Sequence, residues 1–462
     1  MGASVLVSAI SAAFGVLLIS ATGYIAALLR ADPYIGDSDT LALVLMILTT
    51  LLVGVSVYVA GIVTANTFST VVAGRTRQIA LLRLIGASAR AQRAAIARQG
   101  LIVGAIGAAI GLLAGTAAAA AGVALAGRLL ALDHLEFAVV TPTLLIPAAI
   151  VAATTWLSAW LGARRVLTVT PLEAIGGSVE APYERAARRT GRNATAISLL
   201  AIGALFLAGG ILVGFVTPLG VVVAFVGGIL SFTGLALGAT LVMPPVLRLV
   251  GRLFGTSATA RLAAENALRY PERSSRMAIG VVMGVTLVTM FAVALESTKA
   301  VLTAAGGGSL PTEMATLLDA FAGIMMGLVA VSAVIAAVGL VNLLTLGIVQ
   351  RRRELGLLRT LGVSNRQVRG MVLREAAHIT IAATVTGIVL GVFYGWAGAQ
   401  SLLATVPVDL TLPRAVTFVP PALPVWPMVA VVGATALLTL IAAVVPTRLA
   451  TRVAPIAALA DA

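Results

Sequence analysis

The sequence predicts an all-α polytopic membrane protein with ten transmembrane helices, arranged as two parallel four-helix repeats with a two-helix insertion between them. Three observations predict this class. The composition is too apolar for a water-facing surface, because 60% of the 462 residues are hydrophobic and 10% are charged, whereas about a quarter are charged in a typical soluble domain. Ten apolar stretches are long enough to cross a bilayer, and two parts of the chain repeat each other. A soluble enzyme is excluded.

Each of the ten stretches supplies about 20 predominantly apolar residues, the number that a helix needs to cross the hydrocarbon core. The mean hydropathy of the whole chain, +1.08, agrees with so large a share of spanning sequence. The first stretch lacks the basic flank and the short apolar core of a cleaved signal peptide, so we count it as a span. The predicted spans are roughly 4–29, 41–68, 100–127, 143–166, 194–216, 220–247, 277–298, 317–349, 377–404 and 422–446.

Charge divides the loops between these spans into two sets. One set holds 27 of the 31 basic residues and 8 of the 17 acidic ones, a net charge of +19, and the other set has a net charge of −5. Because cytoplasmic loops carry the excess of arginine and lysine, the first set and both termini are predicted to be cytoplasmic. The net charge of +14 is therefore a topology signal, and a nucleic-acid partner is not expected. The predicted cytoplasmic loops are 69–99, 164–193, 248–276, 350–376 and 447–462.

Residue types needed for several kinds of chemistry are scarce. The chain has no cysteine, and its two histidines, His134 and His378, are far apart in sequence, so we expect no metal site and no catalytic residues. The single lysine, Lys299, stands between Thr298 and Ala300, so the Gly-Lys-Ser/Thr signature of a phosphate-binding loop is missing. The chain is not expected to hydrolyse ATP itself.

Two cytoplasmic segments, 75–90 and 351–366, align without a gap at a spacing of 276. A second pair, 164–175 and 448–459, aligns at a spacing of 284. Because both pairs lie on the same predicted side of the membrane, the repeats are parallel and related by an axis along the membrane normal. The predicted domains are 1–175 (first repeat, spans 1–4), 176–257 (cytoplasmic linker and inserted spans 5–6) and 258–462 (second repeat, spans 7–10).

The repeated segment predicts a short amphipathic helix followed by a helix that enters the membrane. Leu357, Leu358 and Leu361 share one helical stripe. Gly362 is predicted to end the first helix and Ser364 to cap the next one. An interfacial helix with arginines on anionic membrane lipids would explain one such copy. A docking surface for a partner, used twice, better explains why both copies keep Leu-Leu-Arg, Gly and Ser at fixed positions.

Residues 352–368 (Arg-Arg-Glu-Leu-Gly-Leu-Leu-Arg-Thr-Leu-Gly-Val-Ser-Asn-Arg-Gln-Val), followed by Glu375-Ala376 and a glycine-rich span, resemble the FtsX-like permeases of ABC transporters, the MacB-like or type VII class. Pro171-Leu-Glu-Ala174 is similar to the closing motif of that family, and residues 260–273 resemble its amphipathic elbow helix. The first copy departs from the pattern, with Gln78 where the second has Glu354.

The resemblance implies that the amphipathic segments are coupling helices seated on a separate cytoplasmic ATPase homodimer, and that the chain lies in the plasma membrane. ATP and Mg are then expected on the partner, with no cofactor in this chain. The departures in the first copy imply that the two docking sites differ in strength. The implied coupling residues are Arg75, Arg77, Ile79, Leu81, Leu82, Arg83 and Gly86 in the first copy, and Arg351, Arg353, Glu354, Leu357, Leu358, Arg359 and Gly362 in the second.

Glycines in two predicted spans form small-residue faces that let helix backbones approach closely. The adjacent prolines Pro244 and Pro245 are predicted to kink or end the sixth span, and His378 is predicted to be a hydrogen-bonded residue near the membrane interface. The glycines predicted to pack helices are Gly107, Gly111 and Gly115 in span 3, and Gly387 and Gly391 in span 9.

The predicted function is that of a permease subunit that couples ATP hydrolysis by its partner to export or extraction of a hydrophobic or amphipathic substrate, or to mechanotransmission across the membrane. Two alternatives stay open: an ion-coupled secondary transporter, which also uses parallel repeats, and a non-transporting signalling subunit with an extracytoplasmic partner. The predicted outer loops after spans 1 and 7, residues 30–40 and 299–316, are too short to bury a core.

Overall fold

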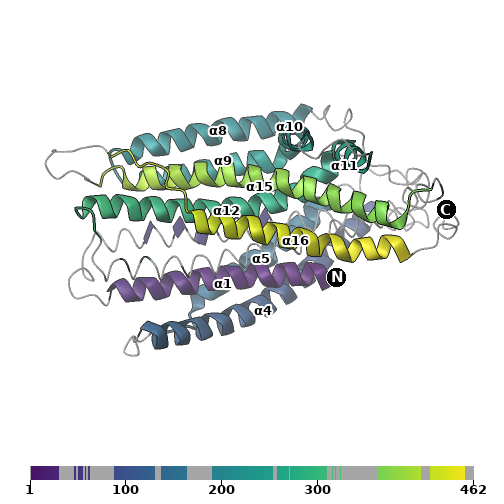
Figure 1. Ribbon diagram of the computed structural model, residues 1–462. Helices are drawn as coiled ribbons and strands as arrows, with labels where there is room; N and C mark the ends of the chain where they lie inside the picture. The colour runs from purple at the N-terminus through teal and green to yellow at the C-terminus, as the bar shows by residue number, and fades with distance from the viewer. Residues whose placement is uncertain are drawn as a thin grey trace. The chain divides into compact units, whose positions relative to one another are not determined.

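The computed structural model describes eight stretches of the chain and a few single residues, and all regular structure within them is helical (Figure 1). The chain divides into two compact units, Met1–Val179 and Glu180–Ala462. The described stretches are 2–30, 88–130, 137–163, 190–252, 258–269, 271–309, 362–406 and 417–452, with single residues between 46 and 62 and at 315, 318, 323 and 360.

The regular structure described in the first unit is mainly three helices and one short 3-10 turn that directly precedes the third of them. The central helix, α4, packs against both of the others, and those two also contact each other. Ser8 and Thr155 share a hydrogen bond of 3.4 Å between the outer two helices. These elements are α1 (Gly2–Arg30), α4 (Ala89–Leu130), the turn η1 (Pro142–Leu144) and α5 (Leu145–Gly162).

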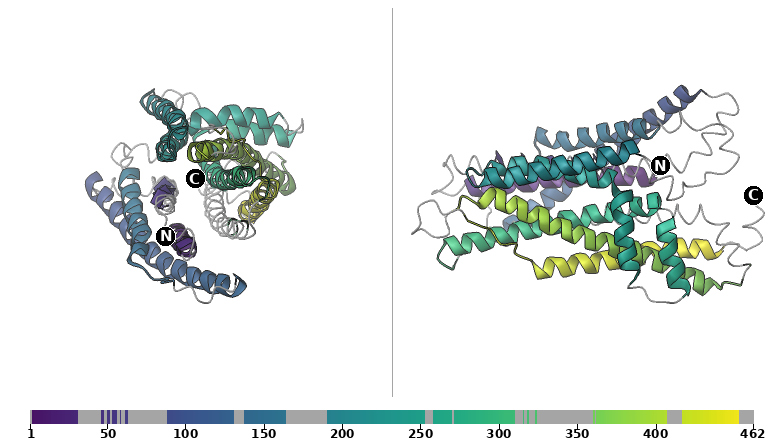
Figure 2. Two further views of the ribbon diagram at one scale, coloured as in Figure 1. Left: turned by 90° about the vertical axis from the view of Figure 1, so that its left-hand side faces the viewer. Right: turned by 90° about the horizontal axis from the view of Figure 1, so that it is seen from above.

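The second unit is built around α15 (Asn365–Leu403), which contacts all six of the other described helices in that unit. Most of these helices run alongside α15, but two of them, α10 and α11, run across its direction at the end where α15 begins (Figures 1 and 2). The other six elements are α8 (Thr190–Gly214), α9 (Gly220–Leu237), α10 (Ala239–Gly251), α11 (Ala258–Arg269), α12 (Pro271–Ala305) and α16 (Val425–Arg452).

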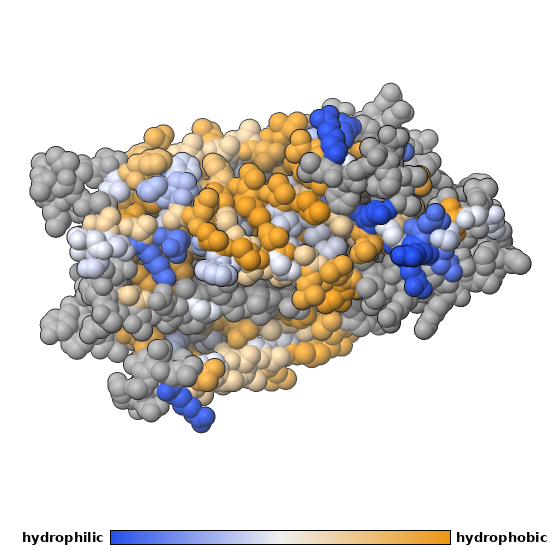
Figure 3. Space-filling model, in the orientation of Figure 1, coloured by the Kyte–Doolittle hydropathy of each residue, from blue (hydrophilic) through white to orange (hydrophobic). Residues whose placement is uncertain are grey.

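Seven helices in the described part of the chain are long and apolar enough to cross a membrane. They match seven of the predicted spans, and the last predicted span, 422–446, coincides with the helix α16. The surface agrees with this, because apolar residues cover the middle of the long helices and hydrophilic residues lie toward their ends (Figure 3). The predicted spans 41–68 and 317–349 lie almost wholly outside the described residues, so the count of ten stays a prediction.

The two longest described helices, α4 and α15, are much longer than a membrane span. The helix α4 has 42 residues and α15 has 39, so at about 1.5 Å per residue they measure about 63 and 58 Å, against about 30 Å for the hydrocarbon core. Each begins more than ten residues before the predicted span, at Ala89 and Asn365. The extra turns connect the repeated cytoplasmic motifs to the spans without a break in the helix.

Pro244 and Pro245 were predicted to kink or end the sixth span, and they do not end it. The break falls earlier, at Gly238, and α10 continues through both prolines. A side chain at Gly238 would crowd the Gly234 carbonyl oxygen and the Ala196 side chain, at 3.0 and 3.1 Å from its Cβ. Both prolines lie inside α10, where each removes one backbone N–H donor from the helix. Within the segment predicted as an elbow helix, 260–273, the helix α11 ends at Arg269 and α12 begins at Pro271.

Candidate functional site

The start of α15 is fixed by a capping box. The Ser364 Oγ accepts a hydrogen bond from the Gln367 backbone N–H at 3.3 Å, and the Gln367 Oε1 accepts one from the Ser364 N–H at 2.8 Å. Two residues earlier, Gly362 has a φ of 95°, a conformation that glycine adopts without steric cost. The predicted cap at Ser364 is confirmed, and Gly362 has the backbone conformation typical of a residue that follows a helix.

The first repeat begins its long helix in the same way. The Ala91 N–H donates to the Ser88 Oγ at 3.1 Å, and the Gln92 N–H donates to the Ser88 carbonyl oxygen at 3.1 Å. Ser88 and Ser364 occupy equivalent positions of the two aligned segments. The two repeated motifs therefore lead into α4 and α15 through equivalent caps.

Most of the predicted coupling residues precede these caps and lie outside the described residues. Gly362 is the one that falls within the described part of the chain. The structure therefore shows the capped helices that follow the motifs, while the docking surface itself stays a prediction. The coupling residues outside the described part are Arg75, Arg77, Ile79, Leu81, Leu82, Arg83, Gly86, Arg351, Arg353, Glu354, Leu357, Leu358 and Arg359.

A contact that the sequence did not predict joins the beginning of α4 to the end of α5. The Arg93 guanidinium lies 4.1 Å from the centre of the Trp160 ring, and its Nε donates to the Trp160 carbonyl oxygen at 3.4 Å. Arginine interacts favourably with the carbonyl groups at a helix C-terminus and with an aromatic face. Arg93 was predicted only as a topology signal, because an aromatic partner in a distant span leaves no local signature.

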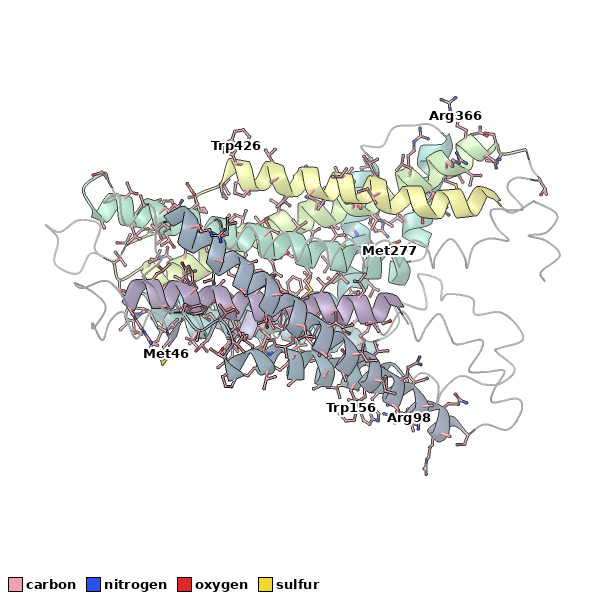
Figure 4. All side chains as sticks on the ribbon, turned by 90° about the horizontal axis from the view of Figure 1, so that it is seen from below. Met46, Arg98, Trp156, Met277, Arg366 and Trp426 are labelled. Carbon is pink, nitrogen blue, oxygen red and sulfur yellow. The ribbon has the colours of Figure 1, made fainter. Side chains whose placement is uncertain are left out.

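Charged residues mark the beginning of the long helices. Arg98 lies close to the beginning of α4, and Arg366 lies at the beginning of α15 (Figure 4). Trp426, at the beginning of α16, lies toward the other end of the second unit and is strongly exposed. An exposed tryptophan at a helix end is typical of a membrane interface.

In the first unit, glycines of α4 face the backbone of α1. A Cβ placed on Gly107 would lie 2.5 Å from the Ser8 Cβ, and one on Gly115 would lie 2.9 Å from the Val16 Cβ. Gly111 would contact the Ala9 carbonyl oxygen more closely still. These distances leave no room for a side chain, so the predicted glycine face lies where two helices pack.

In the second unit, glycines of α15 face α12 in the same way. A Cβ on Gly387 would lie 2.7 Å from the Val285 Cβ, and one on Gly391 would lie 2.5 Å from the Thr289 Cβ. Gly395, on the same face, would lie 2.5 Å from the Met290 carbonyl oxygen.

The register of the two glycine contacts is the same. Gly111 faces Ala12, and its equivalent in the second repeat, Gly387, faces Val285. About one turn later in every one of these helices, Gly115 faces Val16 and its equivalent Gly391 faces Thr289. The pairs α1–α4 and α12–α15 therefore pack through equivalent residues.

His378 is buried in the second unit, with 1% of its surface exposed. Its Nε2 lies 2.6 Å from the Leu247 carbonyl oxygen of α10. Because a carbonyl oxygen only accepts, Nε2 carries the hydrogen and donates. The prediction of a hydrogen-bonded histidine is confirmed, but the partner is the backbone of another helix. Among the described residues no group of histidine and acidic side chains is arranged to hold a metal ion.

The FtsX-like permease C-terminal family model matches the chain twice, at residues 50–171 and 326–455, which together make up more than half of it. The chain belongs to the FtsX-like permease family. The starts of the two matched segments have a spacing of 276 and their ends a spacing of 284, as in the two pairs of repeated motifs. The family model and the apolar helices make the chain a multi-pass membrane protein.

Similar proteins include three bacterial transporter subunits. The chain is 30% identical over 101 residues to the ABC transporter permease YknZ of Bacillus subtilis, covering 22% of this chain and 23% of that protein. It is 37% identical over 73 residues to the ABC transporter permease YtrF of the same organism, 15% of this chain and 16% of the relative. It is 32% identical over 136 residues to the lipoprotein-releasing system transmembrane protein LolC of Haemophilus influenzae, 29% and 33% of the two chains. Each match thus spans a third or less of the relative.

Proposed function

We propose that this FtsX-like permease is the membrane subunit of an ABC transporter and that a separate ATPase homodimer docks on its two cytoplasmic motifs. The observation that carries the proposal is the double family match, because each matched segment contains one copy of the amphipathic motif, 75–90 or 351–366. Both similar proteins from Bacillus subtilis are ABC transporter permeases by name. In this proposal one chain supplies both docking sites, and ATP and Mg bind only to the partner.

The capped helices support a mechanical role for the motifs. Each motif leads through an equivalent serine cap into a helix that continues into the predicted span, α4 or α15. A helix transmits force along its axis because every turn is hydrogen-bonded to the next. Movement of the motifs on a closing ATPase dimer would therefore be passed through one short turn into helices that continue into the packed bundles.

The substrate class that we propose is a hydrophobic or amphipathic molecule drawn from the bilayer. One similar protein, LolC, belongs by name to a lipoprotein-releasing system, and a lipoprotein carries lipid. Among the described residues, the buried polar side chains are those of serine, threonine and glutamine, apart from Glu375 and His378. Intramembrane ionisable side chains mark ion and proton pathways, so the small number of buried ionisable groups in the described part of the chain favours a lipid-soluble substrate or force transmission over ion transport.

The test is co-purification of the tagged chain with candidate ABC ATPases. Leu358→Asp and Leu82→Asp place a charge on the predicted apolar stripes and are expected to lower ATPase recovery and stimulated ATP hydrolysis about tenfold or more, since burying an unpaired carboxylate at an interface costs several kcal/mol. Leu358→Met keeps the stripe apolar and is the matched control.

Three results would overturn the proposal. The first is complex formation and stimulated hydrolysis that survive both aspartate substitutions. The second is the absence of any bound ATPase in the wild type. The third is substrate movement by the purified chain in vesicles with an ion gradient and no nucleotide, which would instead indicate a secondary transporter.

A further inference from the structure

The crosswise helix α10 is tied by side chains from three of the long helices. From α12, the Ser275 Oγ donates to the Ala239 carbonyl oxygen at 3.1 Å. From α8, the Arg192 Nη2 donates to the Thr240 Oγ1 at 2.8 Å. From α15, His378 donates to the Leu247 carbonyl oxygen at 2.6 Å. The helix is thus bonded near both of its ends, and the bond from α15 is the shortest of the three.

The bond from α15 lies in a closely packed site. A Cβ on Gly251, at the end of α10, would lie 3.3 Å from the Cε1 of the His378 ring. The Leu247 and Met243 side chains on the same side of α10 are fully buried. Since the ring fills its site and its hydrogen bond goes to the backbone, a displacement of α15 here must either move α10 or break a buried hydrogen bond, which leaves a buried polar group unsatisfied.

On its other side, α10 continues from the inserted pair of helices. It follows α9 directly at Gly238, and α9 packs along α8 with glycines at the contact. A Cβ on Gly203 of α8, for example, would lie 2.7 Å from the Ser231 Cβ of α9. The helices α8, α9 and α10, which cover the predicted inserted spans 5 and 6, therefore form a continuous packed element, the insertion.

The first repeat has no such joint among its described residues. The position in α4 equivalent to His378 is Ile102, which is 52% exposed. An isoleucine side chain has no donor for a carbonyl oxygen. The histidine is thus present in the repeat whose helix α15 contacts the insertion, at a position where the other repeat has an apolar residue.

We infer that His378 is a positioning residue that transmits the movement of α15 to the insertion. In the proposed function, the ATPase moves the motif at 351–366 and the capped α15 behind it. Within the first half of α15, the His378 imidazole holds α10, so that α9 and α8 move with α15. The inference rests on the proposed function and goes beyond it, because it gives the two repeats different roles.

The test compares two amides that differ by one methylene group. In His378→Gln the side-chain NH2 reaches the place of Nε2 and retains the bond to the Leu247 carbonyl oxygen, whereas in His378→Asn it falls short. His378→Ile introduces the residue of the first repeat. Hydrogen exchange of residues 220–251 is measured by mass spectrometry in the permease–ATPase complex, with and without trapped nucleotide.

In the wild type and in His378→Gln, trapping is expected to change the exchange of this segment. In His378→Asn and His378→Ile the nucleotide-dependent change in exchange should be reduced about fivefold or more. ATPase recovery is expected to be the same in all four proteins. A full nucleotide-dependent change in the asparagine variant, or no change in the wild-type complex, overturns the inference and leaves the proposed function intact. The absence of any ATPase bound to the wild type overturns both.

Discussion

Single glycines set the distance between helices in both units. The equivalent residues Gly111 and Gly387 lie against the backbone of the neighbouring helix, and so do Gly115 and Gly391. In a lipid environment helices gain little from burying apolar surface, so close van der Waals packing at small residues becomes a main source of association. The glycine face was predictable from sequence because its four-residue spacing is a local pattern, but which helix it faces was not.

A pair of glycine substitutions in α15 tests this packing at the residue scale. Gly391→Ala is expected to destabilise the protein by about 1–3 kcal/mol, because its Cβ would meet the Thr289 Cβ at 2.5 Å and the Thr286 carbonyl oxygen at 2.8 Å, which is overpacking. Gly398→Ala is the matched control on the same helix, since nothing lies within 4 Å of its Cβ. The measurement is the thermal unfolding midpoint in detergent. Equal midpoints for the two variants would contradict the packing assignment.

At the scale of the element, each long helix begins where the predicted ATPase-docking motif, 75–90 or 351–366, leads into the membrane bundle. Ser364 and Gln367 satisfy each other's backbone groups at the start of α15, and Ser88 does part of the same at the start of α4. The first repeat has Ala91 where the second has Gln367, so the reciprocal half of the capping box is missing there. The two helices are therefore expected to begin with different stability.

Ser364→Ala is expected to loosen the first turn of α15. Loss of an N-cap costs about 1 kcal/mol, which corresponds to roughly fivefold faster amide exchange in that turn. Ser364→Asp retains an acceptor for the Gln367 N–H and serves as the control. Hydrogen exchange of the first two turns measures the effect, and an unchanged rate in the alanine variant would show that the cap contributes nothing to the helix start.

The elements differ in how far sequence could predict them. Hydropathy located the described spans because a membrane helix is defined by a local apolar run, and Ser364 was predicted as a cap because its signal is also local. The break at Gly238 was not predicted, because apolar residues continue through Leu241, Val242 and Met243. Hydropathy does not show where a helix ends and the next one begins in another direction. The contact of His378 with Leu247 joins two distant parts of the sequence through a main-chain oxygen, which leaves no mark on sequence.

At the scale of the whole molecule, the two repeats differ in the elements that are packed against them. Both repeats match the family model and pack their glycine helices in the same register. The second unit alone contains α8, α9 and α10, which contact α15. A single chain thus contains two family segments and one additional element, an asymmetry that a dimer of identical permease chains does not have.

The predicted orientation is testable on intact cells, because the chain has no native cysteine. Ser309→Cys lies in the turn after α12, on a predicted outer loop, and should react with a membrane-impermeant maleimide. Arg366→Cys, at the beginning of α15, should react only after the cells are opened. Both positions are exposed in the structure, so exposure within the protein does not distinguish them. Labelling of both cysteines in intact cells would contradict the predicted topology.

The length of α15 also has a geometric consequence. Residues 365–376 precede the predicted span and, at about 1.5 Å per residue, form an arm of about 18 Å outside the bilayer. A tilt of α15 by roughly 10° about the membrane surface would sweep the tip of such an arm sideways by about 3 Å. A docked ATPase would therefore need to displace the tip of this arm by only about 3 Å to tilt the whole helix. A small movement on the cytoplasmic side would suffice for a large change in the bundle.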